Sequence, residues 1–311
     1  MNLLTTKHFF YYFLQMSLEY ILSPNQWFSA TITQFANHQY FKDFVELINA
    51  DDQASLLCSL FHGFICGNMN KKQNDKFSSK LTHEFIIRLI NCGKNNEVWV
   101  QLDDRVACFG LQEFCFITGL PCHEPTVDLN FSNTRLRDEY FDGSKRITMI
   151  RLSEVFHICE DREDKFKLGL VMFVECVLKP TRRHIDYRTL GMVEQLDEFL
   201  TYPWGRKAYF VLLHSLQESQ LERIRRMQQN NQAECKYSLH GYPLVFQYWI
   251  YEAFPKIGLQ FGHRIRTSLK CPQMHKWQPQ MVLAENVIKE FLAIEEVCSF
   301  QYTIKYMFYS L

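Results

Sequence analysis

The chain has 311 residues, and its 34 Lys and Arg balance its 34 Asp and Glu, so the formal net charge is zero. Hydrophobic residues make up 47% of the chain and charged residues 22%, which excludes extensive disorder and permits a sizeable buried core. The chain also lacks the overall basic excess of proteins that bind nucleic acid over a large surface, because phosphates are neutralised by cationic side chains.

Cysteine usage and the N-terminus indicate where the protein resides. The 11 cysteines are scattered singly and form no Cys-x-x-Cys pair, which predicts reduced thiols in a nuclear or cytoplasmic protein. The apolar run 8–14 is far shorter than a membrane span of roughly 20 residues, and no cleavage site follows it. We therefore expect no membrane association and interpret this run as a first helix or as the product of an inaccurate gene start.

The N-terminal region, residues 1–67, is predicted to be helical. Apolar residues recur at spacings of three and four in two clusters, and Asp51 and Asp52 are suited to cap the second. The clusters are Phe41, Phe44, Val45 and Ile48, and then Leu56, Leu57, Leu60, Phe61 and Phe64. Residues 68–79 form the most polar segment and are predicted to be a surface loop.

The next stretch is predicted to contain a helix, a β-hairpin and another helix. The first helix is closed by Gly93, and its apolar face consists of Phe85, Ile86, Leu89 and Ile90. Alternating apolar residues on either side of Asp103-Asp104 predict two paired strands over 98–109. A short helix is expected over 111–118.

The rest of the chain is predicted to be mainly helical. We expect a polar loop over 131–146, and over 281–311 a C-terminal helix and a tail whose lack of pattern points to truncation. Pro243 suits the first position of a helix that runs to Phe254. The other expected helices span 164–178, 189–200 and 206–229. The predicted fold class is therefore α+β and predominantly helical, a compact multi-helix domain with one small β-hairpin.

Three segments carry motifs that occur together in one family. Residues 108–120 resemble its FGL-x-EF-x-x-ITGL core, residues 202–209 its YPWGR-x-AY element, and residues 237–255 its Y-x-L-x-G-x-P…W-x-YEA-x-P element. A helix that opens with Asp164 and ends near Leu178 matches the family between the first two motifs. The chain thus resembles a plant-specific domain of unknown function that lies N-terminal to SUMO-protease-like domains in proteins derived from Mutator-like transposons.

The resemblance assigns residues 80–280 to this domain. Its motif positions are Phe109, Gly110, Glu113, Phe114, Thr118, Gly119, Leu120, Pro203, Trp204, Gly205, Arg206, Gly241, Pro243, Trp249, Glu252 and Pro255. Aromatic residues at helical spacing usually pack in a core, and glycine and proline usually shape turns, so we interpret these positions as structural. The resemblance implies a plant source and favours the nucleus, but it implies no known activity.

The family context predicts an interaction module rather than an enzyme. A SUMO-protease-like domain needs a His, an Asp, a Gln and a Cys in an Asp-Cys-Gly context, and this series is absent from the chain. Asn91-Cys92-Gly93 is the nearest imitation, and it precedes most of the candidate histidines. We therefore expect a non-catalytic module that positions a protein partner or a linked SUMO-protease-like domain.

Two other kinds of site were weighed against this interpretation. Nucleic-acid binding would use basic clusters in the C-terminal third and just before it, namely Arg182, Arg183, Arg223, Arg225, Arg226, Arg264, Arg266 and Lys270. Zinc could be held by Cys58, His62 and Cys66 on one helix face, but buried thiols in an apolar helix are much commoner. No nucleotide-binding motif occurs, so we expect no cofactor and no metal.

Overall fold

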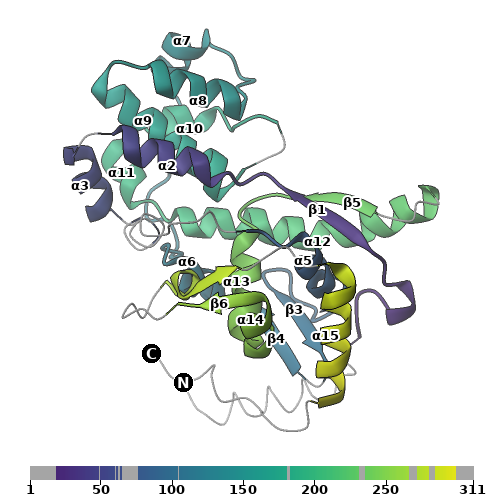
Figure 1. The fold of residues 1–311 in the computed structure, drawn as a ribbon. Coiled ribbons are helices and arrows are strands. Elements are labelled where there is room, and N and C mark those ends of the chain that lie inside the picture. The colour runs from purple at the N-terminus through teal and green to yellow at the C-terminus, as the bar shows by residue number, and fades with distance from the viewer. Residues whose placement is uncertain are drawn as a thin grey trace.

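The computed structural model describes residues 19–48, 50–59, 61, 64, 76–103, 105–180, 183–230, 235–265, 272–279 and 284–298. It confirms an α+β fold that is predominantly helical. The long helix α12 (Trp204–Asn230) runs between a region of packed helices and a region built on a small sheet (Figure 1). No helix among these residues is both long and apolar enough to cross a membrane.

The first region, called the helical region below, consists of α2 (His38–Leu47), α3 (Ala50–Cys58), α7 (Arg135–Phe141), α8 (Met149–Ile158), α9 (Arg162–Phe173), α10 (Arg188–Met192) and α11 (Leu196–Thr201). The predicted apolar face of α2 is confirmed, because Phe41 packs against Phe173 and Phe44 against Phe156 and Phe166. Asn37 caps α2 by accepting a hydrogen bond from the Gln39 N–H.

Several sequence predictions for the helical region are corrected. The expected loop over 131–146 contains α7, which buries only Leu136 and Phe141 and is too short to show a helical period. Helix α8 was not predicted. The single helix expected over 189–200 is the pair α10 and α11. Asp51 and Asp52 lie inside the first turn of α3 rather than before the helix. Their negative charge in that turn still stabilises the helix through its dipole.

Helix α9 continues without a break as a π-helix, Val174–Leu178. Together they cover the helix that was predicted to end near Leu178, and Gly169 lies at the centre of α9. A Cβ atom on Gly169 would stand 2.1 Å from a ring carbon of Phe44, so the glycine lets α2 approach α9 closely. The N-terminal helix α2 is therefore packed into the main core.

The second region, called the sheet region below, is built on the strands β2 (Leu89–Ile90), β3 (Val98–Leu102) and β4 (Arg105–Phe109) in that order. The predicted hairpin is confirmed, with Leu102 opposite Arg105 and Asp103 at a positive φ of 54° in its turn. Leu89 and Ile90 form β2 and pair with β3, which corrects their assignment to a helix. Helix α5 (Ser79–Ile86) ends before them, and Gly93 lies in the β2–β3 turn at a φ of 68°.

Two further strand pairs were not predicted. Strand β1 (Ala30–Gln34) pairs in parallel with β5 (Cys235–Leu239), with Ala30 opposite Cys235. Strand β6 (Gly262–Arg264) pairs antiparallel with β7 (Trp277–Pro279). The partners in the β1–β5 pair are far apart in the sequence, so no local pattern could reveal the pairing. The pair ties the N-terminal part of the chain to the segment that follows α12.

The remaining elements complete the sheet region. They are α6 (Leu111–Thr118), α13 (Leu244–Ala253), α14 (Pro255–Phe261), α15 (Glu285–Cys298) and the short 3-10 helices η1 (Pro24–Gln26) and η3 (Gln273–Lys276). Helix α12 was predicted from Arg206 and begins two residues earlier. The helix expected over 281–297 is α15, whereas the polar loop up to Asp75 and the tail 299–311 lie outside the described residues.

Candidate functional site

The first motif forms α6 and both of its ends. The Gly110 N–H donates to Glu113 Oε2 at 2.9 Å, so Glu113 caps the N-terminus of its own helix. At the other end Thr118 Oγ1 donates to the Phe114 carbonyl at 2.8 Å. Gly119 has a φ of 69° and donates to the Cys115 carbonyl, which confirms its predicted role as the left-handed cap.

The aromatic residues of all three motifs meet in one core. Phe109 packs against Tyr209 on α12 and against Phe246 and Trp249 on α13, with ring centroids 5.2 to 5.9 Å apart. Phe114 also contacts Tyr209, at 5.7 Å. Offset and edge-to-face contacts at these distances favour packing beyond simple burial of area. The motifs are therefore assembled around one buried aromatic cluster.

The second motif turns the chain into α12 and seats that helix on the loop after α6. Trp204 is buried and its Nε1–H donates to the Phe199 carbonyl at 2.9 Å. A Cβ atom on Gly205 would stand 2.7 Å from both Leu120 Cβ and the Pro121 carbonyl oxygen. Only glycine fits this contact, which explains why the helix can begin directly after Pro203.

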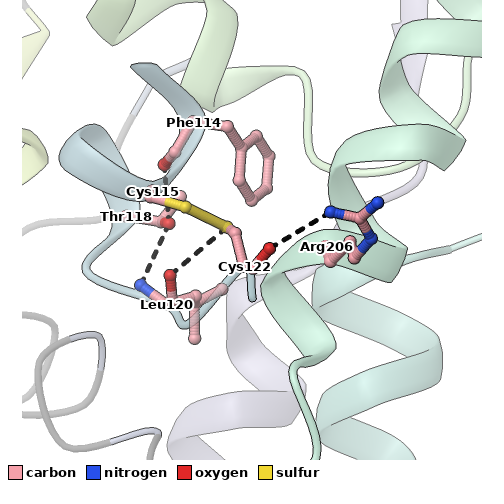
Figure 2. The surroundings of a disulfide bond; sticks show 6 residues. All are labelled: Phe114, Cys115, Thr118, Leu120, Cys122 and Arg206. Carbon is pink, nitrogen blue, oxygen red and sulfur yellow. Dashed lines mark hydrogen bonds between the residues drawn. A yellow bond between two sulfur atoms is a disulfide. The ribbon is translucent and has the colours of Figure 1, made fainter. Parts of the chain in front are cut away.

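A disulfide and an arginine tie the same junction together. Cys115 on α6 is bonded to Cys122, and Arg206 donates to the Cys122 carbonyl at 3.4 Å (Figure 2). Arg206 also donates to the Glu124 carboxylate. The prediction that all cysteines are reduced thiols is wrong for this pair. The two residues are only seven apart in the sequence, and the turn at Gly119 brings their Cα atoms to 6.1 Å.

The third motif shapes the connection from β5 into α13. Gly241 has a φ of 76°, and a Cβ atom there would stand 2.9 Å from the Leu212 backbone nitrogen. Pro243 lies at the N-cap of α13, one position before the predicted one. Glu252 accepts a hydrogen bond from Trp277 Nε1 at 2.5 Å, and Pro255 opens α14.

A cleft of about 430 Å³ opens where the first two motifs meet. It lies between the ends of β3 and β4, the first turn of α6 and the first turns of α12. Its lining includes Glu97, Cys108, Gly110, Glu113, Arg206 and Tyr209. Gly110, Glu113 and Arg206 were predicted family positions, and the structure brings them together, whereas Glu97 and Tyr209 were not singled out as site residues. Tyr209 belongs to the second motif, whereas no local motif marks Glu97, which only the fold places beside Gly110.

Acidic groups converge above Gly110 on the floor of the cleft. A Cβ atom on Gly110 would stand 3.0 Å from Glu113 Oε2, 3.6 Å from Glu97 Oε2 and 3.8 Å from Cys108 Sγ. Burial raises the pKa of the Cys108 thiol, and the carboxylates of Glu113 and Glu97 raise it further. The thiol therefore stays protonated at neutral pH.

The neighbouring ionisable groups are held by specific bonds. Burial raises the pKa of Glu97, but hydrogen bonds from Lys94 and Trp99 outweigh this and leave it below its ordinary value. Lys94 Nζ lies 2.7 Å from Glu97 Oε1. Burial raises the pKa of Tyr209, whose hydroxyl donates to the Asn96 carbonyl at 2.6 Å. Glu97 is thus an anion at neutral pH, while Tyr209 is neutral.

Of the candidate nucleic-acid contacts, the structure describes the side chains of Arg183 and Arg264, which belong to different regions of the fold. Exposed Arg183 lies just before α10, and Arg264 lies on β6 with its guanidinium 5.5 Å from the Trp277 ring centroid. Arg223, Arg225 and Arg226 lie on the C-terminal half of α12. In Figure 1 the end of α12 projects to the right, whereas β6 lies beside α13 and α14 in the sheet region. Arg182, Arg266 and Lys270 lie outside the described residues.

The zinc alternative also falls largely outside what the structure describes. His62 and Cys66 are not among the described residues, and of Cys58 only the backbone in α3 is. Within the described part of the chain, no group of three His, Cys, Asp or Glu side chains could hold a metal ion.

Comparison with known proteins places a domain over the middle of the chain. Residues 86–215 match the family model DUF1985, a domain of unknown function. The matched span contains the first two motifs and the whole cleft, and it ends before the third motif. Comparison with curated proteins and with solved structures gives no match.

Proposed function

We propose that the protein is a non-catalytic interaction module whose binding surface is the cleft between α6 and α12. The observation that carries this proposal is that residues of the first two motifs lie in two different environments. Their apolar residues, such as Phe109, Phe114 and Trp204, are buried in the core, whereas Gly110, Glu113 and Arg206 line an open cleft. The same sequence segments thus build both the core and the surface that a ligand can reach.

The chemistry of the cleft supports binding over catalysis. The thiolate is the nucleophilic form of cysteine, and the raised pKa of Cys108 keeps its thiol protonated. No histidine is among the described residues that line the cleft, so Cys108 has no neighbouring imidazole to act as a base there. The cleft instead offers fixed carboxylates, a paired guanidinium and an exposed Gln112, which are groups suited to recognising a polar partner.

The resemblance supplies the biological setting of this proposal. The match of residues 86–215 to a domain of unknown function agrees with the resemblance at that level. Plant origin, descent from a Mutator-like transposon, and a partner related to a SUMO-protease-like domain are proposed on the motifs alone. On the same grounds we propose a nuclear or cytoplasmic location, with the nucleus favoured.

Site-specific photo-crosslinking of the full chain in plant cells tests the function. A photoreactive residue is introduced at Gln112, which is exposed and lines the cleft, and in a matched control at Glu160, which is exposed between α8 and α9. We expect protein adducts at Gln112 to exceed those at Glu160 severalfold, and mass spectrometry then identifies the partner for measurement with purified components. Equal labelling at both positions contradicts the proposal.

The purified full chain is also used to test the alternative function, nucleic-acid binding. Binding to generic duplex DNA is measured by fluorescence anisotropy at 50 and 200 mM salt. A protein that uses several phosphate contacts loses affinity by orders of magnitude over about this range. Such a loss, together with absent protein adducts at Gln112, would replace the interaction module with nucleic-acid binding.

A further inference from the structure

The outer edge of β4 presents backbone groups that the fold leaves open. The Gln101 N–H donates to the Arg88 carbonyl at 3.1 Å, so Gln101 directs its backbone toward β2. By the two-residue alternation of an antiparallel ladder, Val98, Val100 and Leu102 bond to β4 through Phe109, Ala107 and Arg105. Val106 and Cys108 therefore direct their N–H and C=O groups away from the sheet. Within the described part of the chain, no hydrogen bond reaches these four groups.

The opposite edge of the same sheet is covered by the chain itself. The Ile21 N–H donates to the Leu89 carbonyl at 2.8 Å, and the Asn91 N–H donates to the Glu19 carbonyl at 2.9 Å. An extended segment thus bonds to the Leu89 carbonyl of β2 and to the Asn91 N–H that follows the strand, and proteins commonly protect a sheet edge by covering it. The edge at β4 has the same alternation and no such cover among the described residues.

The charge beside β4 selects the kind of segment that fits. Cys108 and Gly110 line the cleft as well as this end of the strand, so a segment on β4 passes the carboxylates of Glu113 and Glu97. Glu97 is paired with Lys94, and the cleft's own cation, Arg206, is bound to Glu124. Among the described residues, Glu113 accepts a hydrogen bond from the Gly110 N–H alone and pairs with no cation. A cationic side chain from a partner is the group that compensates this carboxylate.

We propose that β4 receives an extended segment of a partner protein that carries a lysine or arginine. The added strand exchanges hydrogen bonds with the backbone of Val106 and Cys108, and its cationic side chain reaches Glu113 and Glu97. The inference rests on the proposed interaction function and names the chemistry of its partner. The main-chain bonds give affinity, and the carboxylate of Glu113, which has no cation partner among the described residues, gives the preference for a basic residue.

The experiment starts from a phage-displayed library of nine-residue peptides selected on the full chain. We expect at least tenfold enrichment of lysine or arginine at one position. The selected peptide is then synthesised with a fluorophore, and its binding is measured by anisotropy. A selection without basic enrichment would overturn the proposal.

The wild type and three variants separate the contribution of the backbone hydrogen bonds from that of the carboxylate charge. Val106→Pro removes an outward N–H without removing a bond to β3, and proline is tolerated at a sheet edge. We expect it to weaken peptide binding at least tenfold, whereas the matched Val106→Thr binds like the wild type. Glu113→Gln keeps an oxygen for the Gly110 N–H but loses the charge, so it should weaken binding severalfold and lose the preference for lysine over glutamine. Far-UV circular dichroism checks that each variant is folded.

The outcomes also distinguish this inference from the proposed function. If Val106→Pro binds the peptide like the wild type, strand addition at β4 is overturned while crosslinking at Gln112 can still succeed. If the wild type is a dimer by light scattering and Val106→Pro is a monomer, a second copy of the chain occupies the edge and the peptide proposal is overturned. If crosslinking at Gln112 fails as well, the proposed interaction function is also contradicted.

Discussion

Two buried segments of this protein are held together in different ways. Helix α9 with its π-helical continuation is fixed by ionised side chains, whereas the junction of α6 with α12 is fixed by aromatic packing and glycine contacts. Both segments lie in the core and both match the family, but only the second carries glycine and aromatic motifs that predict its contacts. Each buried ion needs a partner in three dimensions. Lys179 lies only four residues after Glu175, but the partners of Asp164 and Lys167 include residues on other helices or turns.

The charges of α9 show how far apart such partners are. Asp164 accepts hydrogen bonds from Arg135 on α7 and from the Tyr140 hydroxyl at 2.8 Å. Lys167 lies 2.8 Å from Glu194 in the turn between α10 and α11. These contacts connect helices that are separated by about 30 residues of sequence. Each buried carboxylate or ammonium is thereby compensated, which is the condition for a stable buried ion pair.

The α6–α12 junction relies on shape instead. Gly205 packs directly on Leu120 and the Pro121 carbonyl, and Tyr209, one turn later, fills the space beside Phe109 and Phe114. The contacts depend on close approach and ring geometry rather than on charge. The comparison predicts that the α9 segment is destabilised when a buried ion loses its partner. The α6–α12 junction is destabilised when an added atom fills the space of a close contact.

Removing the buried carboxylate of Glu175 should have the largest effect. Glu175 in the π-helix accepts bonds from Lys179, Thr189 Oγ1 and the Asp186 N–H, and its side chain is 1% exposed. Glu175→Ala leaves Lys179 and Thr189 without their acceptor, and breaking a buried pair in this way costs about 3–5 kcal/mol. We expect that loss in the free energy of unfolding measured with urea.

An exposed ion pair on the neighbouring helix is the control for this measurement. Arg151 and Glu154 on α8 lie 3.5 Å apart with side chains 51% and 57% exposed. Glu154→Ala should change the free energy of unfolding by less than about 1 kcal/mol, because water screens the pair. Similar losses for the two variants would mean that burial does not separate the two kinds of charge contact.

Filling the space at the α6–α12 junction should have the next largest effect. Gly205→Ala places a methyl group 2.7 Å from the Pro121 carbonyl oxygen, a backbone atom that can move only with its loop. Overpacking of this kind costs about 1–3 kcal/mol. The exposed Lys207 lies on the same helical turn, so Lys207→Ala is the matched control, and its midpoint in urea should stay near that of the wild type.

The same distinction explains what the sequence could predict. The hairpin over 98–109, the cap at Gly119 and the long helix α12 depend on local spacing and on turn residues, and all three were correctly predicted. Strand β2 was assigned to a helix because Phe85, Ile86, Leu89 and Ile90 happen to follow a helical period across the end of α5. Helix α7 was missed because it is short and mostly polar.

Only part of the candidate site could be predicted from the sequence, for a related reason. Gly110, Glu113 and Arg206 belong to motifs, but Glu97 became a site residue only because the β2–β3 turn places it beside Gly110. Likewise, the open edge of β4 depends on which residues of β3 bond to β2. Such features belong to the register and packing of the fold, and no single segment of sequence encodes them.

The smallest effect should appear as a pH dependence of the helical region. The hydrogen bond from Arg135 lowers the pKa of Asp164, burial opposes this, and the Tyr140 hydroxyl lowers it further. A carboxyl group whose pKa is lower in the folded state stabilises that state above its unfolded pKa, here near 3.8, and this contribution is lost as the pH falls below it. Asp164→Asn should therefore be less stable than the wild type at pH 6, but it should lose less stability between pH 4 and pH 2.5.

Urea unfolding across this range measures both slopes, with Glu198→Gln on the exposed face of α11 as the control that keeps the slope of the wild type. Parallel curves for Asp164→Asn and the wild type would show that this ion pair does not link stability to pH. Asp164 would then act in the helical region through its hydrogen bonds to Arg135 and Tyr140 rather than through its charge.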